Sequence, residues 1–269
     1  MLNFIDHSGP DDQPPLLIAH GLFGSARNWG VIAKRLTNTR RVVVVDHRNH
    51  GSSSWFDSHS YHDLAKDLEE VIAHVGAPCD VMGHSMGGKA AMVLALLRSE
   101  LVASLCIADI APVVYEHDQI QFIKAMKAVD FTTVKNRSDV RAQLCEKVDD
   151  VGLQNFFVQS VDFEHRRWRL NLDVLEDAMP KILGFPKVDG TYNGKTLFLS
   201  GGNSNYVLPE MRGYIKTLFP AAVFAKIPGV GHWIHAERPR AFEEVLRMFF
   251  TNHLENRGPA KRPKREILD

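Results

Sequence analysis

The stretch Cys79-Asp80-Val81-Met82-Gly83-His84-Ser85-Met86-Gly87-Gly88 leads from a short apolar segment into the pattern G-x-S-x-G. The residues after it, 89–97, are rich in alanine and leucine and favour a helix. Strand, tight turn and helix form the context in which this pattern presents a serine hydroxyl at a strand tip. Glycines at 83 and 87 leave room for so sharp a turn. We therefore predict that Ser85 is a nucleophile, with a plain strand–turn–helix as the alternative.

Length, charge and cysteine content narrow the class of protein. The 269 residues suffice for one large domain or two small ones. Lys+Arg and Asp+Glu both number 32, so net charge gives no reason to expect a nucleic-acid partner. Three widely spaced cysteines favour a reducing compartment over a disulfide framework. The polar, acidic start and the lack of long apolar runs lead us to expect a cytoplasmic protein with no membrane partner.

Apolar runs alternate with helical patterns on both sides of the turn. Strands are predicted at 16–19, 41–46, 101–109, 195–200 and 223–227, and helices at 26–36, 61–75, 209–218 and 237–250. Such alternation predicts an α/β fold with a mostly parallel central sheet flanked by helices.

Residues 113–185 break this rhythm, because they are helical in character and rich in charge. We predict a helical cap here, inserted after the strand that ends at Asp109 and joining two core segments, 1–112 and 186–255. The basic, proline-containing residues 256–269 predict a disordered tail. Large apolar residues of the cap and nearby loops are core by default, and some are candidates for lining a substrate pocket: Phe23, Phe122, Met126, Phe156, Trp168 and Trp233.

A serine hydroxyl needs a base to remove its proton, and that base needs a group to orient it. The best base is His232, in the loop after the last predicted strand. The chain order nucleophile, acid, histidine is the one that this type of turn requires. His235 is a competitor, but its place at the start of the last helix favours bracing of the loop.

Four motifs together resemble the α/β-hydrolase superfamily over nearly the whole chain: the Ser85 turn, His20-Gly21, Asp46-x-Arg48-Asn49-His50-Gly51-x-Ser53 and Gly231-His232. Four segments are similar to the YbfF-type small esterases in particular: His20-Gly21-Leu22-Phe23-Gly24-Ser25, Gly83–Lys89, Asp109-Ile110-Ala111-Pro112 and Gly201-Gly202-Asn203-Ser204. This resemblance implies esterase and acyl-CoA thioesterase activity.

The acid departs from the superfamily's common position. Most members carry it a few residues after the strand at 197–200, where this chain has Gly201-Gly202-Asn203-Ser204-Asn205 and no carboxylate. The YbfF-type resemblance implies that Asp109 is the acid instead, while a turn cap ahead of Pro112 is the alternative. Ser204 is then either a helper that donates to Asp109 or His232, or a simple turn serine.

Other loop residues have predicted supporting roles. The backbone N–H groups of Leu22 and Met86 are the predicted donors to an oxyanion. Asp46 and Arg48 are predicted to pair and brace their loop. The three arginines at 166, 167 and 169 either face the phosphates of coenzyme A or form a solvated basic face.

These residues predict a serine hydrolase that needs no cofactor or metal and cleaves esters or acyl thioesters with short-to-medium acyl chains through an acyl-Ser85 intermediate. The expected partner is a small acyl ester or acyl-CoA, and the expected state is a monomer or homodimer. One alternative is a cofactor-free haloperoxidase- or perhydrolase-like activity on the same triad. Another is a non-catalytic ligand-binding module of the same fold.

Overall fold

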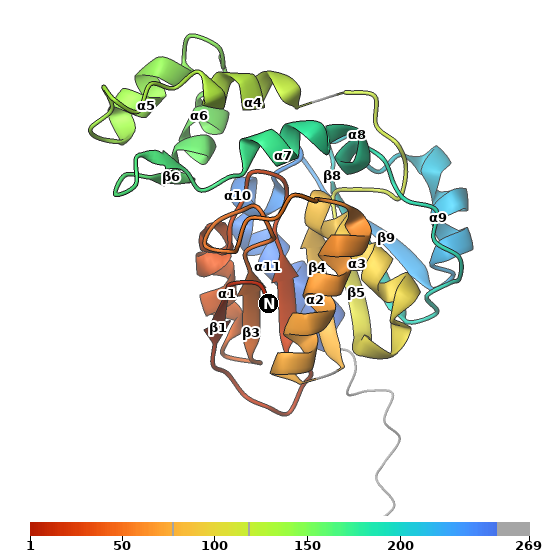
Figure 1. The fold of residues 1–269 in the computed structure, drawn as a ribbon. Helices are drawn as coiled ribbons and strands as arrows, with labels where there is room; N and C mark the ends of the chain where they lie inside the picture. Colours follow the sequence, from red (N-terminus) through yellow and green to blue (C-terminus); the bar gives the residue numbers. More distant parts are fainter. Residues whose placement is uncertain (77, 118, 252–269) are drawn as a thin grey trace, which may run out of the picture.

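A seven-stranded sheet forms the centre of the computed structural model, which describes residues 1–76, 78–117 and 119–251. Its strand order is β1-β3-β2-β4-β5-β8-β9 (Figure 1). β1 pairs antiparallel with β3, and the other neighbours are parallel. The strands are β1 (Phe4–His7), β2 (Leu16–Ala19), β3 (Val42–Val45), β4 (Cys79–His84), β5 (Val102–Ala108), β8 (Lys195–Gly201) and β9 (Ala222–Ile227). The predicted α/β fold is thus confirmed, whereas β1, a short and partly exposed edge strand, was not expected.

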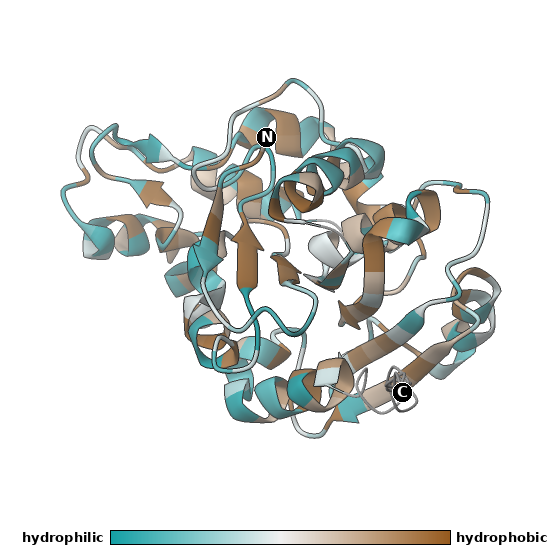
Figure 2. Cartoon of the chain, turned by 90° about the horizontal axis from the view of Figure 1, so that it is seen from below, coloured by the Kyte–Doolittle hydropathy of each residue, from teal (hydrophilic) through white to brown (hydrophobic). Residues whose placement is uncertain are grey.

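Helices cover both faces of the sheet. They are η1 (Ala26–Trp29), α1 (Gly30–Leu36), α2 (Tyr61–Val75), α3 (Met86–Leu97), η2 (Ser99–Leu101), η3 (Pro209–Met211), α9 (Arg212–Leu218), α10 (Ile234–Glu237) and α11 (Pro239–Thr251). α2 and α3 pack on one face, and α1 and α11 on the other. Figure 2 shows the strands as the hydrophobic centre between helices with hydrophilic outer faces. No helix in the described ranges is long and apolar enough to cross a bilayer.

The chain between β5 and β8 forms a layer over one end of the sheet (Figure 1). It contains α4 (Ile120–Lys127), α5 (Arg137–Leu144), α6 (Val151–Val158), β6 (Val161–Asp162), β7 (Arg167–Trp168), α7 (Leu172–Asp177) and α8 (Met179–Leu183). The small β6–β7 sheet was not expected, because strands of two residues leave no alternating pattern. All these elements lie within residues 113–185, which we call the cap. The end of the predicted core segment at 255 and the predicted tail lie outside the described residues.

Lys89, in the first half of α3, holds both connections of the cap. Its Nζ donates to three backbone carbonyls, those of Val113 at 2.9 Å, Leu183 at 2.8 Å and Gly184 at 2.6 Å. Burial alone lowers the pKa of Lys89 to about 7, while three carbonyl acceptors favour the ammonium form, which has three N–H donors. The helix that follows Ser85 therefore anchors the two ends of the cap.

Candidate active site

Ser85 occupies the tight turn between β4 and α3. Its φ of 52° lies in the left-handed region that non-glycine residues rarely adopt. The turn needs glycine on both sides, because a Cβ on Gly83 would lie 2.3 Å from the Gly87 carbonyl oxygen, and one on Gly87 would lie 2.4 Å from that of Ala19. The strained turn places the Ser85 side chain beyond the end of the strand, as G-x-S-x-G predicts.

Asp109 lies beside Ser85 because β4 and β5 are parallel neighbours, with His84 opposite Ala108. Its carboxylate is fully buried. Oδ1 accepts a hydrogen bond from the Gly201 backbone N–H at 3.0 Å. Oδ2 accepts from the Ser204 hydroxyl at 2.5 Å and from His232 Nδ1–H at 2.7 Å. The carboxylate therefore points across to the loop after β8 and to the histidine, and not into a cap of its own turn.

His232 bridges the carboxylate and the serine. Because Nδ1–H donates to Asp109, the Nε2 lone pair is free to accept the Ser85 hydroxyl, whose Oγ lies 3.1 Å away. His235 instead stacks on Trp29 with ring centroids 4.1 Å apart, and burial lowers its pKa to about 3. The structure thus brings Ser85, His232 and Asp109 into one chain of hydrogen bonds, while His235 is a neutral packing residue.

Two backbone N–H groups near Ser85 have no acceptor recorded among the described residues. Met86 is the first residue of α3, so its N–H has no partner within the helix. Leu22 lines the adjoining cavity, and its N–H has no recorded acceptor in the described part of the chain. The Phe23 N–H is occupied, because it donates to His50 Nε2 at 3.2 Å. These contacts leave Leu22 and Met86 as the available pair.

Asp46 and Arg48 brace the loop after β3, but not as the predicted pair. Asp46 accepts from the backbone N–H groups of Ala26 at 2.7 Å and Ser52 at 2.9 Å. Arg48 instead forms a bidentate ion pair with Asp67 on α2, in which Nε donates to Oδ2 at 2.6 Å and Nη2 donates to Oδ1 at 2.8 Å. The prediction of a mutual pair is therefore wrong, since Asp46 is matched by backbone N–H groups and Arg48 by Asp67.

A cavity of about 260 Å³ opens beside Ser85 and His232, between the sheet and the cap. Of the predicted pocket residues, four line it: Phe23, Phe122, Phe156 and Trp233. Met126 and Trp168 do not, and this corrects the prediction. Both are buried within the cap, where Trp168 Nε1 donates to the Met126 carbonyl at 2.7 Å. Helical spacing marked them as apolar but could not show which face of the cap they occupy.

Several residues that line the cavity were not singled out from the sequence: Tyr61, Lys89, Tyr115, Phe157, Ile182, Leu183 and Tyr206. Three of them, Tyr115, Ile182 and Leu183, lie at the two ends of the cap, where no sequence pattern shows which side chains turn inward. Tyr206 is an exception, because it lies two residues after Ser204 in the loop already searched for the acid. A search for aromatic neighbours of the histidine in that loop would have found it.

The three arginines predicted to face either phosphate or solvent lie outside the cavity. Arg166 and Arg167 are exposed, and the Arg167 guanidinium lies 5.3 Å from the Trp55 ring centroid. Arg169 is half-buried and lies 3.6 Å from Asp162 Oδ1. The basic segment therefore faces solvent and its own acidic neighbour.

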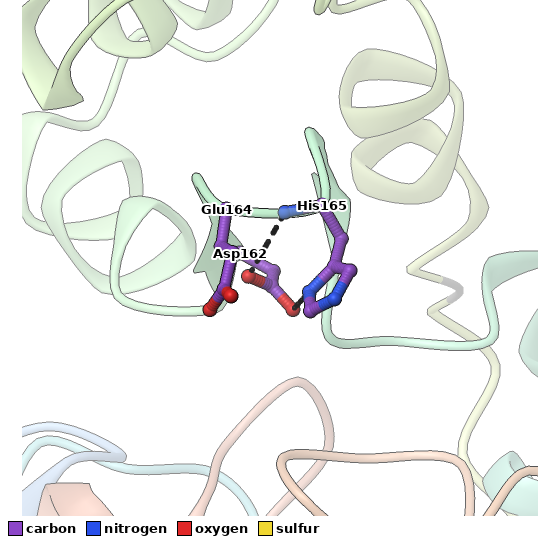
Figure 3. A group of neighbouring side chains, drawn as sticks. All are labelled: Asp162, Glu164 and His165. Atoms are coloured by element: carbon purple, nitrogen blue, oxygen red, sulfur yellow. Dashed lines mark hydrogen bonds and ion pairs between the residues drawn. The ribbon is translucent and has the colours of Figure 1, made fainter.

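Figure 3 shows Asp162, Glu164 and His165, whose ligand atoms lie within 4.8 Å of one another. Asp162 Oδ2 accepts from His165 Nδ1–H at 2.9 Å, so these two candidate metal ligands are already hydrogen-bonded to each other. The nearby Arg169 guanidinium would repel a cation. The chemistry of this group thus does not favour a bound metal ion.

Comparisons with known proteins match most of the chain to hydrolases and esterases. The sequence profile of the Alpha/beta hydrolase family matches residues 16–245. The chain is 40% identical to the mouse "sn-1-specific diacylglycerol lipase ABHD11", over 92% of this chain and 83% of the relative. It is 37% identical to "Esterase YbfF" of Escherichia coli K12, over 90% and 94%. A solved "Marine microorganism esterase" superimposes with a TM-score of 0.87 at 34% identity, covering 93% of this chain and 100% of the esterase. The chain belongs to the alpha/beta hydrolase family.

Proposed function

We propose that the protein is a serine hydrolase that cleaves carboxylic esters through an acyl-Ser85 intermediate. The observation that carries the proposal is the hydrogen-bonded chain from Ser85 Oγ through His232 to the buried Asp109. The names of two similar proteins, an esterase and a diacylglycerol lipase, support ester substrates.

In the first half-reaction, His232 Nε2 takes the Ser85 proton while Oγ attacks the ester carbonyl carbon. The carbonyl oxygen becomes an oxyanion that accepts from the Leu22 and Met86 N–H groups. When the tetrahedral intermediate collapses, the bond to the leaving alcohol breaks and His232 returns the proton to that oxygen. Asp109 keeps the imidazole oriented and stabilises the imidazolium between these steps.

In the second half-reaction, a water molecule replaces the alcohol. His232 takes a proton from the water while the water oxygen attacks the acyl carbon. The carboxylic acid then leaves as His232 returns the proton to Ser85 Oγ. Every step uses the same base and the same two N–H donors, so the described residues supply all the groups that the cycle requires.

The cavity suggests the acyl part of the substrate. Its volume of about 260 Å³ lies near the lower end for ligand sites, and aromatic side chains form much of its wall. We therefore propose short-to-medium acyl chains. Acyl thioesters undergo the same chemistry and belong to the proposal, but the arginines at 166, 167 and 169 lie outside the cavity and lend no support to coenzyme A recognition.

A fluorophosphonate probe followed by an ester panel tests the proposal. The wild type and a Ser54→Ala control, which changes an exposed serine, should be labelled, and Ser85→Ala should not. Turnover of p-nitrophenyl esters and acyl-CoAs of graded chain length then ranks substrates. Absence of labelling and turnover would indicate a binding module, and peroxide-dependent halogenation faster than ester cleavage would indicate the haloperoxidase-like alternative.

A further inference from the structure

The imidazole of His232 has hydrogen bonds at both ring nitrogens and other rings packed against it. Tyr206 stacks on it with ring centroids 3.9 Å apart and an interplanar angle of 21°. His84 lies 4.8 Å away at 40°, and its Nε2–H donates to the His232 carbonyl at 3.0 Å. Burial lowers the pKa of His84 well below its usual value and that of His235 to about 3, so both neighbouring imidazoles are neutral. The hydrogen bonds at Nδ1 and Nε2 do not by themselves fix the tilt of the ring, so the rings packed against it must limit that tilt.

Tyr206 is itself fixed at three points. Its backbone N–H donates to Ser204 Oγ at 3.2 Å, and its carbonyl accepts from the Tyr115 hydroxyl at 2.7 Å. Its hydroxyl is 2.7 Å from His117 Nε2. Burial raises the pKa of Tyr206 to about 12, so its ring is that of a neutral phenol at physiological pH. The ring over His232 is therefore positioned by the loop after β8 on one side and by the first residues of the cap on the other.

This arrangement has a chemical consequence during the proposed reaction. His232 becomes a cation each time it takes a proton from serine or water. The face of an aromatic ring attracts a cation, and a stacked ring also limits the motion that would carry Nε2 away from Ser85 Oγ. Tyr206 does both without giving or taking a proton itself.

We infer that Tyr206 is a positioning residue for His232, and that its contacts with Tyr115 and His117 make the geometry of the base depend on the docked start of the cap. The inference rests on the proposed function, since it assumes that His232 is the base. It goes further by assigning a role to an aromatic side chain that carries no proton in the reaction.

Tyr206→Leu and Tyr206→Phe separate the ring from the hydroxyl. With p-nitrophenyl acetate, whose acyl group is too small to fill the cavity, Tyr206→Leu should lower kcat about 10- to 100-fold with a smaller change in KM. Tyr206→Phe keeps the ring and should lose no more than about threefold. Tyr214→Leu makes the same substitution at an exposed tyrosine on α9 and should match the wild type.

The pH profile distinguishes positioning of the base from general damage. The acidic limb of kcat/KM reports the base of the free enzyme, so loss of the ring that favours the imidazolium should move this limb of Tyr206→Leu to lower pH by about 0.5 unit. A lost substrate contact would leave the limb in place. Wild-type kcat and an unmoved limb in Tyr206→Leu would overturn the inference, as would a Tyr206→Phe variant as impaired as Tyr206→Leu.

Tyr115→Phe decides the question if Tyr206→Leu does not fold. It leaves both rings in place but removes the hydroxyl that holds the Tyr206 carbonyl, and it should move the acidic limb in the same direction while lowering kcat several-fold. An unmoved limb would contradict the inference. A wild-type protein that cleaves no ester would refute the proposed function, whereas an active wild type with an equally active Tyr206→Leu would refute only the role of Tyr206.

Discussion

The loops after β5 and β8 leave neighbouring parallel strands at the same end of the sheet, yet they bring opposite chemistry to His232. The loop after β5 supplies one buried carboxylate, Asp109. The end of β8 and the loop after it supply donors and a ring: the Gly201 N–H and Ser204 hydroxyl bond to that carboxylate, and Tyr206 stacks on the imidazole. The acid and its supporting groups are thus divided between two loops.

This division shows what the site requires of each loop. A histidine over Ser85 lies within reach of both strand ends, because Ala108 on β5 pairs with Leu199 on β8 and the Asp109 N–H donates to the Leu199 carbonyl at 2.8 Å. The position of the acid along the chain can therefore change while its position in space is kept. The loop that lacks the carboxylate still contributes, by satisfying the lone pairs of a buried charge.

The largest effect is expected when the nucleophile or the base is removed, because both loops act on this pair. Ser85→Ala and His232→Ala should each lower kcat by at least about a thousandfold, and the double variant should be hardly worse than either single one, because all three disable the same proton transfer. Steady-state kinetics on p-nitrophenyl acetate measure this, with the exposed-site variants Ser54→Ala and His62→Ala as controls. Additive losses would show that the two residues do not act together.

The next largest effect is expected when the acid is moved from the loop after β5 to the loop after β8. Ser204 Oγ lies 2.5 Å from Asp109 Oδ2, so Ser204→Asp in an Asp109→Asn background places a carboxylate close to His232 Nδ1. We expect this double variant to recover at least about tenfold in kcat over Asp109→Asn alone, because a carboxylate again favours the Nδ1–H tautomer. Equal kcat values for the two variants would show that the loop after β8 cannot replace the loop after β5.

A smaller effect is expected when only the loop after β8 is changed. Ser204→Ala removes one hydrogen bond to the buried carboxylate, worth about 1.4 kcal/mol, and should lower kcat about tenfold. The Gly201 N–H still bonds to the carboxylate in this variant. Rate measurements that showed a loss as large as that of Asp109→Asn would mean that Ser204, and not Asp109, is the decisive orienting group.

The smallest effect expected near neutral pH is on stability. It sets the pH range over which the activities of the loop variants can be compared. Burial lowers the pKa values of His59 and His235 to about 3, so both stay neutral in the folded protein where the unfolded chain binds protons. Because the unfolded state then binds more protons, the free energy of unfolding should fall as pH decreases from about 6.5 towards 3, by about 1.4 kcal/mol per pH unit for each histidine.

Urea unfolding at a series of pH values measures this slope. His235→Phe keeps a ring against Trp29 and should make the slope shallower by one proton, whereas the exposed-site variant His62→Ala should not change it. A free energy of unfolding that does not change between pH 6.5 and 4 would contradict the expectation.

The sheet, its flanking helices and the positions of Ser85 and His232 follow from local patterns, because each strand and helix has its own periodicity and the glycine-flanked turn is specified by adjacent residues. The identity of the acid did not follow from spacing alone, since Asp109 lies in a motif that took its meaning from resemblance to known esterases. The inward face of the cap could not be predicted. Met126 and Trp168 are as apolar as Phe122 and Phe156, and only tertiary packing turns the latter pair towards the cavity.

Asp109→Asn removes the acid that lies after β5 while leaving the other hydrogen-bonding groups of the site in place. Asparagine tolerates the φ of 53° at this position, so the fold and melting temperature should be retained. We expect kcat on p-nitrophenyl acetate to fall by up to about ten-thousandfold, because an amide favours the wrong imidazole tautomer. A folded Asp109→Asn protein with kcat within about tenfold of the wild type would show that Asp109 is not the acid that orients His232.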